Sequence, residues 1–185
     1  VSMPGDGIGK TVLPEAIRVL NAVGFDADYV HGDIGWDFWC SEGNALPQRT
    51  IDLLEKHKIG LFGAITSKPK DAADKELDPS LKGKGFVYFS PIVGLRQKFN
   101  LDICIRPCQS FKGNPLNFII RNAKGGFDEP LVNTVVFRQN TEGLYGGVEW
   151  TNPPKQVRDA LETHPKMKFF KDVPSEDMAI STRIV

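Results

Sequence analysis

The sequence predicts an α/β fold, in which strands and helices alternate along the chain. Two pairs of segments lead to this prediction. A strand end and tight glycine turn over 3–9 precede an amphipathic helical pattern over 10–23. A second helical pattern over 47–57 precedes a continuous apolar run over 59–65, which is typical of a strand buried on both faces. Strands and helices that alternate in this way are characteristic of layered α/β architectures.

Composition argues against several other classes of protein. Of the 185 residues, 41% are hydrophobic and 25% are charged, as in ordinary globular proteins. Basic and acidic residues number 23 each, so we expect no nucleic-acid partner and no membrane partner. No apolar run reaches membrane-spanning length. Cys40, Cys104 and Cys108 are odd in number and lack metal-binding spacing, which favours reduced thiols, a reducing compartment and a cytoplasmic location.

The first element is a strand end that turns at Gly5-Asp6-Gly7-Ile8-Gly9 into the first helix. This turn lacks the GxGxxG spacing of the dinucleotide-binding fingerprint, so it gives no support for a doubly wound Rossmann domain. A turn that simply needs glycine at positive φ explains the three glycines equally well. The apolar stripe of the following helix consists of Val12, Leu13, Ala16, Ile17 and Leu20.

Residues 25–40 are expected to form a strand and turn. The aromatic residues of this segment are assigned to the core: Trp36, Phe38 and Trp39. The strand over 59–65 ends at Thr66-Ser67, and hydroxyl groups at the carboxyl end of a strand are well placed to meet a ligand. A turn or helix-capping role is the alternative for these two residues. The polar, lysine-rich stretch 68–85 is expected to be a mobile loop.

A short helix followed by a strand carries two arginines. Ser90 is expected to be the N-cap and Pro91 the first helical residue. Arg96 then lies about two turns into this helix. A short strand over 101–105 follows, and Arg106 is expected to end it, just where open α/β sheets tend to bind ligands.

A third arginine, Arg138, ends another apolar run over 132–137. Guanidinium groups stay charged, so three of them beside apolar segments need anionic partners. Together with Tyr145, seven residues beyond the last of them, Arg96, Arg106 and Arg138 have the pattern of a polycarboxylate clamp with a proton donor. Ordinary ion pairs at the ends of elements are the alternative.

The remaining segments are less informative. The pattern of residues 108–128 predicts a strand pair or packed loop. The segment 151–178 is rich in proline, and its pattern predicts one helix near 155–162. The chain opens with Val1-Ser2-Met3 as if within a strand, so we expect it to be the amino-terminal portion of a longer polypeptide.

The sequence resembles the β-decarboxylating dehydrogenases, the isocitrate and isopropylmalate dehydrogenase family. The matching pieces are PGDGIG (4–9), GAITSKP (63–69), SPIVGLRQKFNLDICIRP (90–107) and FRQNTEGLYGGVEW (137–150). The resemblance implies an α/β/α sandwich with a large discontinuous domain, a smaller domain and a dimer-forming arm, and not a Rossmann fold. It implies part of the large cofactor-binding domain over 1–101, part of the small domain over 102–144, and the arm over 145–185.

The resemblance also implies a reaction and a set of residues. Relatives oxidise a 2-hydroxy polycarboxylic acid with NAD or NADP, helped by Mg²⁺ or Mn²⁺, and the product loses carbon dioxide. Tyr145 matches the residue that delivers a proton to the enolate. Positions that contact the substrate are matched by Ser90, Arg96, Arg106 and Arg138, and positions near the cofactor by Ile8, Thr66 and Ser67. The metal ligands and catalytic lysine of relatives lie beyond residue 185, so the 185-residue chain alone is expected to be inactive.

Several substrates and roles stay open. Ser90 favours isocitrate or homoisocitrate over 3-isopropylmalate, although its N-cap role explains the serine equally well. Three departures from relatives bear on this: Lys10-Thr11 in place of Pro-Glu, Ser90-Pro91-Ile92 in place of the Ser-x-Asn of isocitrate enzymes, and Gln139 in place of Glu. We expect isocitrate as the substrate and a homodimer or higher homo-oligomer in contact through 151–178. A surface excursion is the alternative for that segment, and a non-catalytic, tricarboxylate-binding regulatory subunit is the alternative for the whole.

Overall fold

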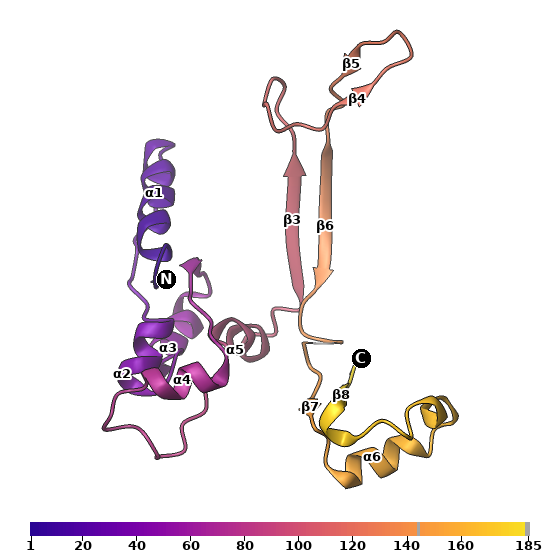
Figure 1. Cartoon of the computed structure of the whole chain (residues 1–185). Helices are drawn as coiled ribbons and strands as arrows, with labels where there is room; N and C mark the ends of the chain where they lie inside the picture. Colours follow the sequence, from indigo (N-terminus) through magenta and orange to yellow (C-terminus); the bar gives the residue numbers. More distant parts are fainter. Residues whose placement is uncertain (144, 184–185) are drawn as a thin grey trace. The chain divides into compact units, whose positions relative to one another are not determined.

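The computed structural model describes residues 1–143 and 145–183, except for the side chains of residues 70 and 71. The chain divides into two compact units, Val1–Leu95 and Arg96–Val185, which are described here separately (Figure 1). The described residues contain four two-stranded sheets, of which one is parallel and three are antiparallel. The first unit therefore carries the parallel pair, and the second unit carries the antiparallel ladders.

The parallel pair of the first unit joins β1 (Ser2–Gly5) to β2 (Leu61–Ala64), with Met3 opposite Phe62. Helix α1 (Gly9–Ala22) starts directly after the glycine turn, as the sequence predicts. Gly9 is needed here because a Cβ atom would lie 2.1 Å from the carbonyl oxygen of Pro4 and 2.5 Å from that of Ala64. The helix can therefore lie against the backbone of both strands only without a side chain at this position.

Helices α2 (Trp36–Glu42) and α4 (Lys70–Glu76) contribute to the main core of the first unit, and α3 (Gln48–His57) lies between them in the sequence. The core cluster consists of Trp36, Trp39, Ala45, Ala73 and Leu77. The indole N–H of Trp39, which is 1% exposed, donates to the carbonyl oxygen of Ala73 at 2.9 Å. This bond and the surrounding apolar contacts fix α4 against α2.

Two expectations for this region are wrong. The tryptophans lie on helix α2 and not on a strand, because Gly35 (φ 114°) and Gly43 (φ 73°) turn the chain sharply at its two ends. The stretch 68–85 is not a loop throughout, since it contains α4, whose Ala73 is completely buried. Alanine and leucine at two positions of a lysine-rich segment are enough to bury one face of a short helix.

Helix α5 (Pro91–Lys98) begins at Pro91 and carries Arg96 in its last turn, as the sequence predicts. The helix spans the division between the two units. In the second unit, β3 (Ile103–Gln109) pairs with β6 (Asn133–Gln139) in a long antiparallel ladder (Figure 1). The ladder runs from the pair Ile103–Gln139 to the pair Gln109–Asn133.

The prediction that Arg106 ends its strand is wrong. Arg106 lies in the middle of β3, opposite Val136, and Pro107 follows it within the strand, opposite Val135. Proline is tolerated because β3 is paired along one edge only in this two-stranded ladder. On the unpaired edge a backbone N–H has no ladder partner, so the N–H that proline lacks costs no hydrogen bond there. The strand-end argument for ligand binding consequently does not apply to Arg106.

The rest of the second unit consists of short elements. A hairpin joins β4 (Ile120–Arg121) to β5 (Phe127–Asp128). A second antiparallel pair joins β7 (Glu149–Thr151) to β8 (Ala179–Ser181). Between these last strands lie α6 (Lys155–Glu162), near the position expected from the sequence, and two 3₁₀ turns, η1 (Pro165–Phe169) and η2 (Ser175–Asp177).

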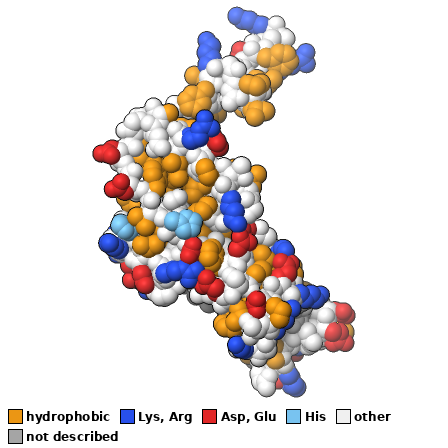
Figure 2. All heavy atoms as spheres, turned by 90° about the vertical axis from the view of Figure 1, so that its left-hand side faces the viewer, with side chains coloured by type: hydrophobic (Ala, Val, Ile, Leu, Met, Phe, Trp, Pro, Cys, Tyr) orange, Lys and Arg blue, Asp and Glu red, His pale blue; other side chains and the backbone are white. Residues whose placement is uncertain are grey.

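Apolar side chains are widely exposed. Figure 2 shows hydrophobic groups in patches on the face that it displays. Exposed examples are Val23, Phe25 and Ile59 in the first unit and Ile105, Phe118 and Phe137 in the second. Apolar surface of this extent marks contact areas in soluble proteins. Among the helices of the described residues, none combines the length and the hydropathy that crossing a bilayer requires.

Candidate functional site

Tyr145 is the point at which two of the predicted arginines meet. The guanidinium carbon of Arg138 lies 4.8 Å from the centroid of the Tyr145 ring, and that of Arg96 lies 5.6 Å from it. Both distances fall within the roughly 6 Å over which an aromatic ring attracts a cation. Arg96 comes from the end of α5 and Arg138 from the end of β6, whereas Tyr145 lies in the turn that follows. Folding therefore gathers these three residues from separate segments.

Arg106 lies on the same face of the β3–β6 ladder as Arg138. Cys104 is directly opposite Arg138, and directly opposed residues share a face, as do residues two apart on one strand. The guanidinium Nε of Arg106 donates to the Cys104 Sγ at 3.3 Å. This bond directs the Arg106 side chain back along β3, toward the residue that pairs with Arg138.

The three guanidinium groups keep their charge available. Other cations of the described residues form ion pairs with carboxylates, for example Lys10 with Asp37 and Arg49 with Glu42. Within residues 1–143 and 145–183, no ion pair includes Arg96, Arg106 or Arg138. A permanently charged group without a carboxylate partner is a strong attractor for an anionic ligand.

Gln139 shapes the turn that carries Tyr145. Its Oε1 accepts hydrogen bonds from the backbone N–H groups of Thr141, at 3.1 Å, and Glu142, at 2.8 Å. Its Nε2 donates to the Thr141 hydroxyl at 2.9 Å. A glutamate in place of Gln139 could accept the first two bonds but could not donate the third. The departure noted in the sequence thus has a local structural role.

Asn140 anchors the same turn to the start of β3. Its backbone N–H donates to the carbonyl oxygen of Asp102 at 2.8 Å, and its Nδ2 donates to that of Leu101 at 3.4 Å. The residue is 6% exposed, and its Oδ1 has no hydrogen-bond partner among the described residues. Asn140 could not be singled out from the sequence, because neither its type nor its spacing distinguishes it from other turn residues.

A second site region lies at the carboxyl edge of β1 and β2, where parallel strands end together. Asp6, which is 4% exposed, accepts hydrogen bonds from the backbone N–H groups of Thr66, at 2.7 Å, and Trp36. Sequence reasoning passed over Asp6. The available signal was an acidic residue between two glycines of a tight turn, a position where a carboxylate commonly satisfies backbone donors.

The expected cofactor residues lie around this edge. A Cβ atom on Gly7 would lie 3.7 Å from the Thr66 hydroxyl, so the glycine turn and Thr66 are close neighbours. The side chain of Ile8 is 69% exposed, and the Ser67 hydroxyl lies 3.4 Å from that of Tyr88. Lys10 pairs with Asp37, which raises the pKa of the ammonium group and directs its charge toward α2. The edge thus offers an open turn, an apolar side chain and hydroxyl groups.

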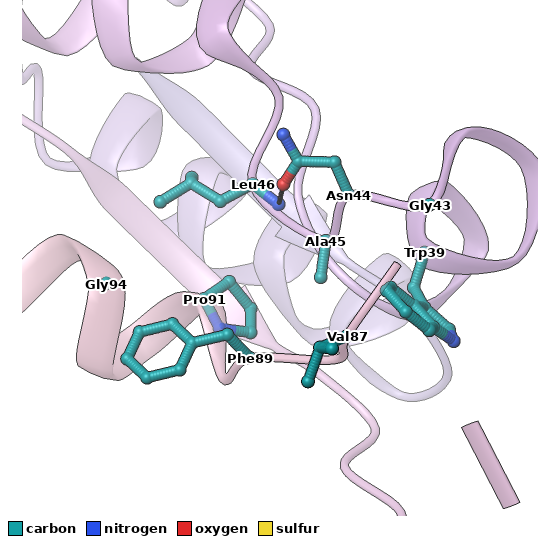
Figure 3. Close-up of a pocket in the computed structure, with 9 residues that line it drawn as sticks. All are labelled: Trp39, Gly43, Asn44, Ala45, Leu46, Val87, Phe89, Pro91 and Gly94. Atoms are coloured by element: carbon teal, nitrogen blue, oxygen red, sulfur yellow. Dashed lines mark hydrogen bonds between the residues drawn. The ribbon is translucent and has the colours of Figure 1, made fainter. Parts of the chain in front are cut away.

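A small pocket adjoins Ser90. Its volume is about 190 Å³, and its lining consists of Trp39, Gly43, Asn44, Ala45, Leu46, Val87, Phe89, Pro91 and Gly94 (Figure 3). The two chain neighbours of Ser90, Phe89 and Pro91, therefore face this mainly apolar space, and Ser90 itself is not part of the lining. The backbone carbonyl of Ser90 accepts the N–H of Gly94 at 3.0 Å, which closes the first turn of α5.

Comparison with known proteins identifies the relatives of the chain. The model of the isocitrate/isopropylmalate dehydrogenase family matches residues 1–170. The chain is 34% identical to Protein DlpA of Legionella pneumophila over 98% of its own length and 27% of that protein. It is 39% identical to the homoisocitrate dehydrogenase of Methanocaldococcus jannaschii over 78% of its own length and 38% of that enzyme.

The fold agrees with this match. A β-decarboxylating dehydrogenase from Thermococcus kodakarensis superposes with a TM-score of 0.55 and 22% identity, over all of this chain and 39% of that structure. The chain thus spans roughly a third of the length of these relatives. The family match covers most of the chain and includes the turn, the arginines and Tyr145. The chain therefore belongs to the isocitrate/isopropylmalate dehydrogenase family.

Proposed function

We propose that the protein catalyses the oxidative decarboxylation of a 2-hydroxy polycarboxylic acid, isocitrate to 2-oxoglutarate, with NAD or NADP as hydride acceptor. One observation carries the proposal. Arg96 and Arg138 converge on the ring of Tyr145, Arg106 shares a ladder face with Arg138, and none of the three forms an ion pair among the described residues.

The substrate-binding step belongs to the arginines. Each guanidinium presents parallel N–H donors that match a carboxylate, and each stays charged at any physiological pH. A tricarboxylate with its carboxylates on adjacent carbons offers one anionic group to each arginine. Ser90, which directly precedes α5, is proposed as a further substrate contact from the family resemblance alone. Binding by fixed charges would hold the 2-hydroxyl carbon in one orientation for oxidation.

The proton-transfer step belongs to Tyr145. Loss of carbon dioxide leaves an enolate, whose carbon must be protonated. A phenol is a weak acid that donates only when negative charge develops next to it, which suits this step. The two neighbouring guanidinium groups would stabilise the oxygen after the proton has left, since opposite charges attract strongly in a partly buried site.

The edge around Asp6 fits a nucleotide. The open glycine turn permits close approach of a ligand to the backbone, and Ile8, Thr66 and Ser67 offer one apolar surface and two hydroxyl groups. When bound, NAD or NADP would accept the hydride from the 2-hydroxyl carbon. No group of three or more His, Cys, Asp or Glu side chains in the described residues could hold a metal ion, so we assign no ligand for Mg²⁺ or Mn²⁺ to this part of the chain.

Homoisocitrate is the second candidate substrate. The 39% identity to a homoisocitrate dehydrogenase favours it, and its carboxylates would be bound by the same arginines. The two acids differ by one methylene group, which typically changes selectivity by about 10- to 200-fold. The extra length must be accommodated beyond the arginine contacts, so the arginines alone do not distinguish the two.

We also propose that 151–178 forms a subunit contact in a homodimer or higher homo-oligomer. Arg158 makes this segment an ordered platform, because its guanidinium donates to Glu162, Ser175 and the carbonyl oxygens of Phe170 and Lys171. Phe169, which is 76% exposed, and Phe170 present apolar surface on the same segment. Exposed aromatic residues on an ordered platform are typical of protein interfaces.

The proposal is tested with the 185-residue chain and with the product of the complete reading frame, called the full-length protein below. Each is assayed with isocitrate, homoisocitrate and 3-isopropylmalate and with NAD and NADP. The full-length protein is expected to form reduced cofactor and carbon dioxide in equal amounts from one acid, and the short chain is expected to be inactive. Binding of a tricarboxylate without turnover of any acid would instead favour a regulatory subunit.

A further inference from the structure

The ring of Tyr145 contacts two cations that no carboxylate in the described residues neutralises. Arg96 and Arg138 lie 5.6 and 4.8 Å from its centroid and are both half-buried, as is Tyr145 itself. Two like charges around one ring repel each other, and the repulsion is stronger where water is partly excluded. Some other interaction must hold the two guanidinium groups together before a ligand arrives.

An aromatic ring can do this without removing their charge. Its electron-rich face attracts a cation, whereas a carboxylate would neutralise the arginines and compete with an anionic ligand. Exposed cations pair readily with carboxylates elsewhere in the chain, as Arg49 does with Asp33 and Glu42. At Tyr145 the neighbour of the two arginines is a neutral ring, which leaves their full charge for a ligand.

The turn that follows Arg138 holds the ring in place. Gln139 follows Arg138 and fixes the turn through Thr141 and Glu142. The backbone N–H of Tyr145 then donates to the carbonyl oxygen of Glu142 at 3.3 Å. A tyrosine side chain has two rotatable bonds, so little conformational freedom remains once its backbone is fixed. The turn therefore presents the ring as a rigid surface.

We propose that the aromatic ring of Tyr145, separately from its hydroxyl group, is a positioning element that holds Arg96 and Arg138 ready to receive the carboxylates of the substrate. This role rests on the proposed function and adds to the proton transfer assigned to the hydroxyl. The ring orients the two arginines before binding, and preorganised donors bind an anion more tightly than mobile ones. The hydroxyl acts later, after carbon dioxide is lost.

Two substitutions separate the ring from the hydroxyl. Tyr145→Phe keeps the ring, and Tyr145→Leu removes it. The full-length protein is titrated calorimetrically with tricarballylate, a tricarboxylate that has no hydroxyl group to oxidise, and turnover is measured with the preferred acid. Tyr145→Phe is expected to bind tricarballylate within about 3-fold of wild type while kcat falls by about 100-fold or more. Tyr145→Leu is expected to weaken tricarballylate binding by about 10-fold or more, because two cation–π contacts are lost.

Phe137→Leu is the matched control, since it removes an exposed aromatic ring from β6, the strand that carries Arg138. Phe137 lies opposite Ile105, on the other face of the ladder from Arg138. The substitution is expected to leave tricarballylate binding unchanged. If Tyr145→Leu does not fold, as judged by circular dichroism, Tyr145→Met replaces it in the same titration. Wild-type affinity in a folded variant without the ring, or an equal loss of affinity in Tyr145→Phe, would overturn the inference. Failure of the wild-type protein to bind tricarballylate would overturn the proposed function itself.

Discussion

The carboxylate of Asp6 accepts a hydrogen bond from the backbone N–H of Thr66 at 2.7 Å, although 60 positions separate the two residues. Its other oxygen accepts the backbone N–H of Trp36. One buried side chain thus joins the glycine turn, the end of β2 and the start of α2. The proposed nucleotide edge depends on this junction, because it fixes the turn beside the Thr66 hydroxyl.

Replacing Asp6 with Asn is expected to destabilise the full-length protein by about 1–3 kcal/mol. The amide nitrogen that replaces one carboxylate oxygen cannot accept a hydrogen bond, so one of the two backbone N–H groups would lose its acceptor. Affinity for the nucleotide is expected to fall as well. Urea unfolding and calorimetric titration with NAD and NADP measure the two effects. Asp37→Asn is the control, since its ion pair with Lys10 is exposed to solvent and should contribute little to stability. Equal stability of the two variants would contradict the assigned role of Asp6.

Gly9→Ala tests the contact between α1 and the parallel strands. The added Cβ atom would approach the carbonyl oxygens of Pro4 and Ala64, both of which belong to the backbone and cannot move away as a side chain would. We expect a loss of about 1–3 kcal/mol in the free energy of unfolding. Gly126→Ala, whose Cβ atom would meet only Asn122 at 3.5 Å, is the comparison. If both glycines tolerate alanine equally, the packing described for α1 is incorrect.

The lowered pKa of Glu76 predicts that the free energy of unfolding falls in acid. Hydrogen bonds from Lys68 and from the Trp36 indole lower the pKa of this carboxyl below its ordinary value of 4.5. The unfolded chain therefore takes up a proton near pH 4.5, whereas folded Glu76 stays ionised, so its contribution is present above this pH and is lost as the pH falls through the folded pKa. In urea unfolding followed by tryptophan fluorescence, wild-type stability should decline below pH 4.5. The decline should be shallower in Glu76→Gln, and an identical pH profile would refute the prediction.

Gln139→Leu is expected to lower kcat of the full-length protein by about 10- to 100-fold, because the turn that carries Tyr145 loses three hydrogen bonds and small displacements of a reacting group slow catalysis strongly. Gln139→Glu keeps two acceptor bonds and should retain activity within a few-fold. Steady-state kinetics compares both with Gln48→Leu, a surface change on α3 whose side chain contacts Asp52. A kcat for Gln139→Leu that matches the Gln48→Leu control would contradict this role of the turn.

Local signals in the sequence predicted several elements well. Proline at the first helical position predicted the start of α5 at Pro91, and the apolar run 132–137 predicted β6. These predictions succeed because capping and apolar patterning act over a few residues. The meeting of Arg96 and Arg138 at Tyr145 followed from the pattern of arginines and the family resemblance, and the structure brings the three together.

Other features depend on contacts that sequence patterns do not encode. Trp36 and Trp39 have strand-like composition, but glycines on both sides and the partners in α4 place them on a helix. Pro107 suggested the end of a strand, yet a two-stranded ladder accommodates it. Asp6 could not be identified as a junction without knowing that Thr66 and Trp36 lie beside it.

The proposed binding of isocitrate by three separate arginines is tested most directly by calorimetric titration of the full-length protein and its Arg96→Lys, Arg106→Lys and Arg138→Lys variants. Lysine keeps the charge but loses the paired donors, so each substitution is expected to weaken binding by about 10-fold or more. Arg18→Lys, on an exposed face of α1, should bind as wild type does. Wild-type affinity in any of the three variants would contradict convergence of these arginines on one substrate.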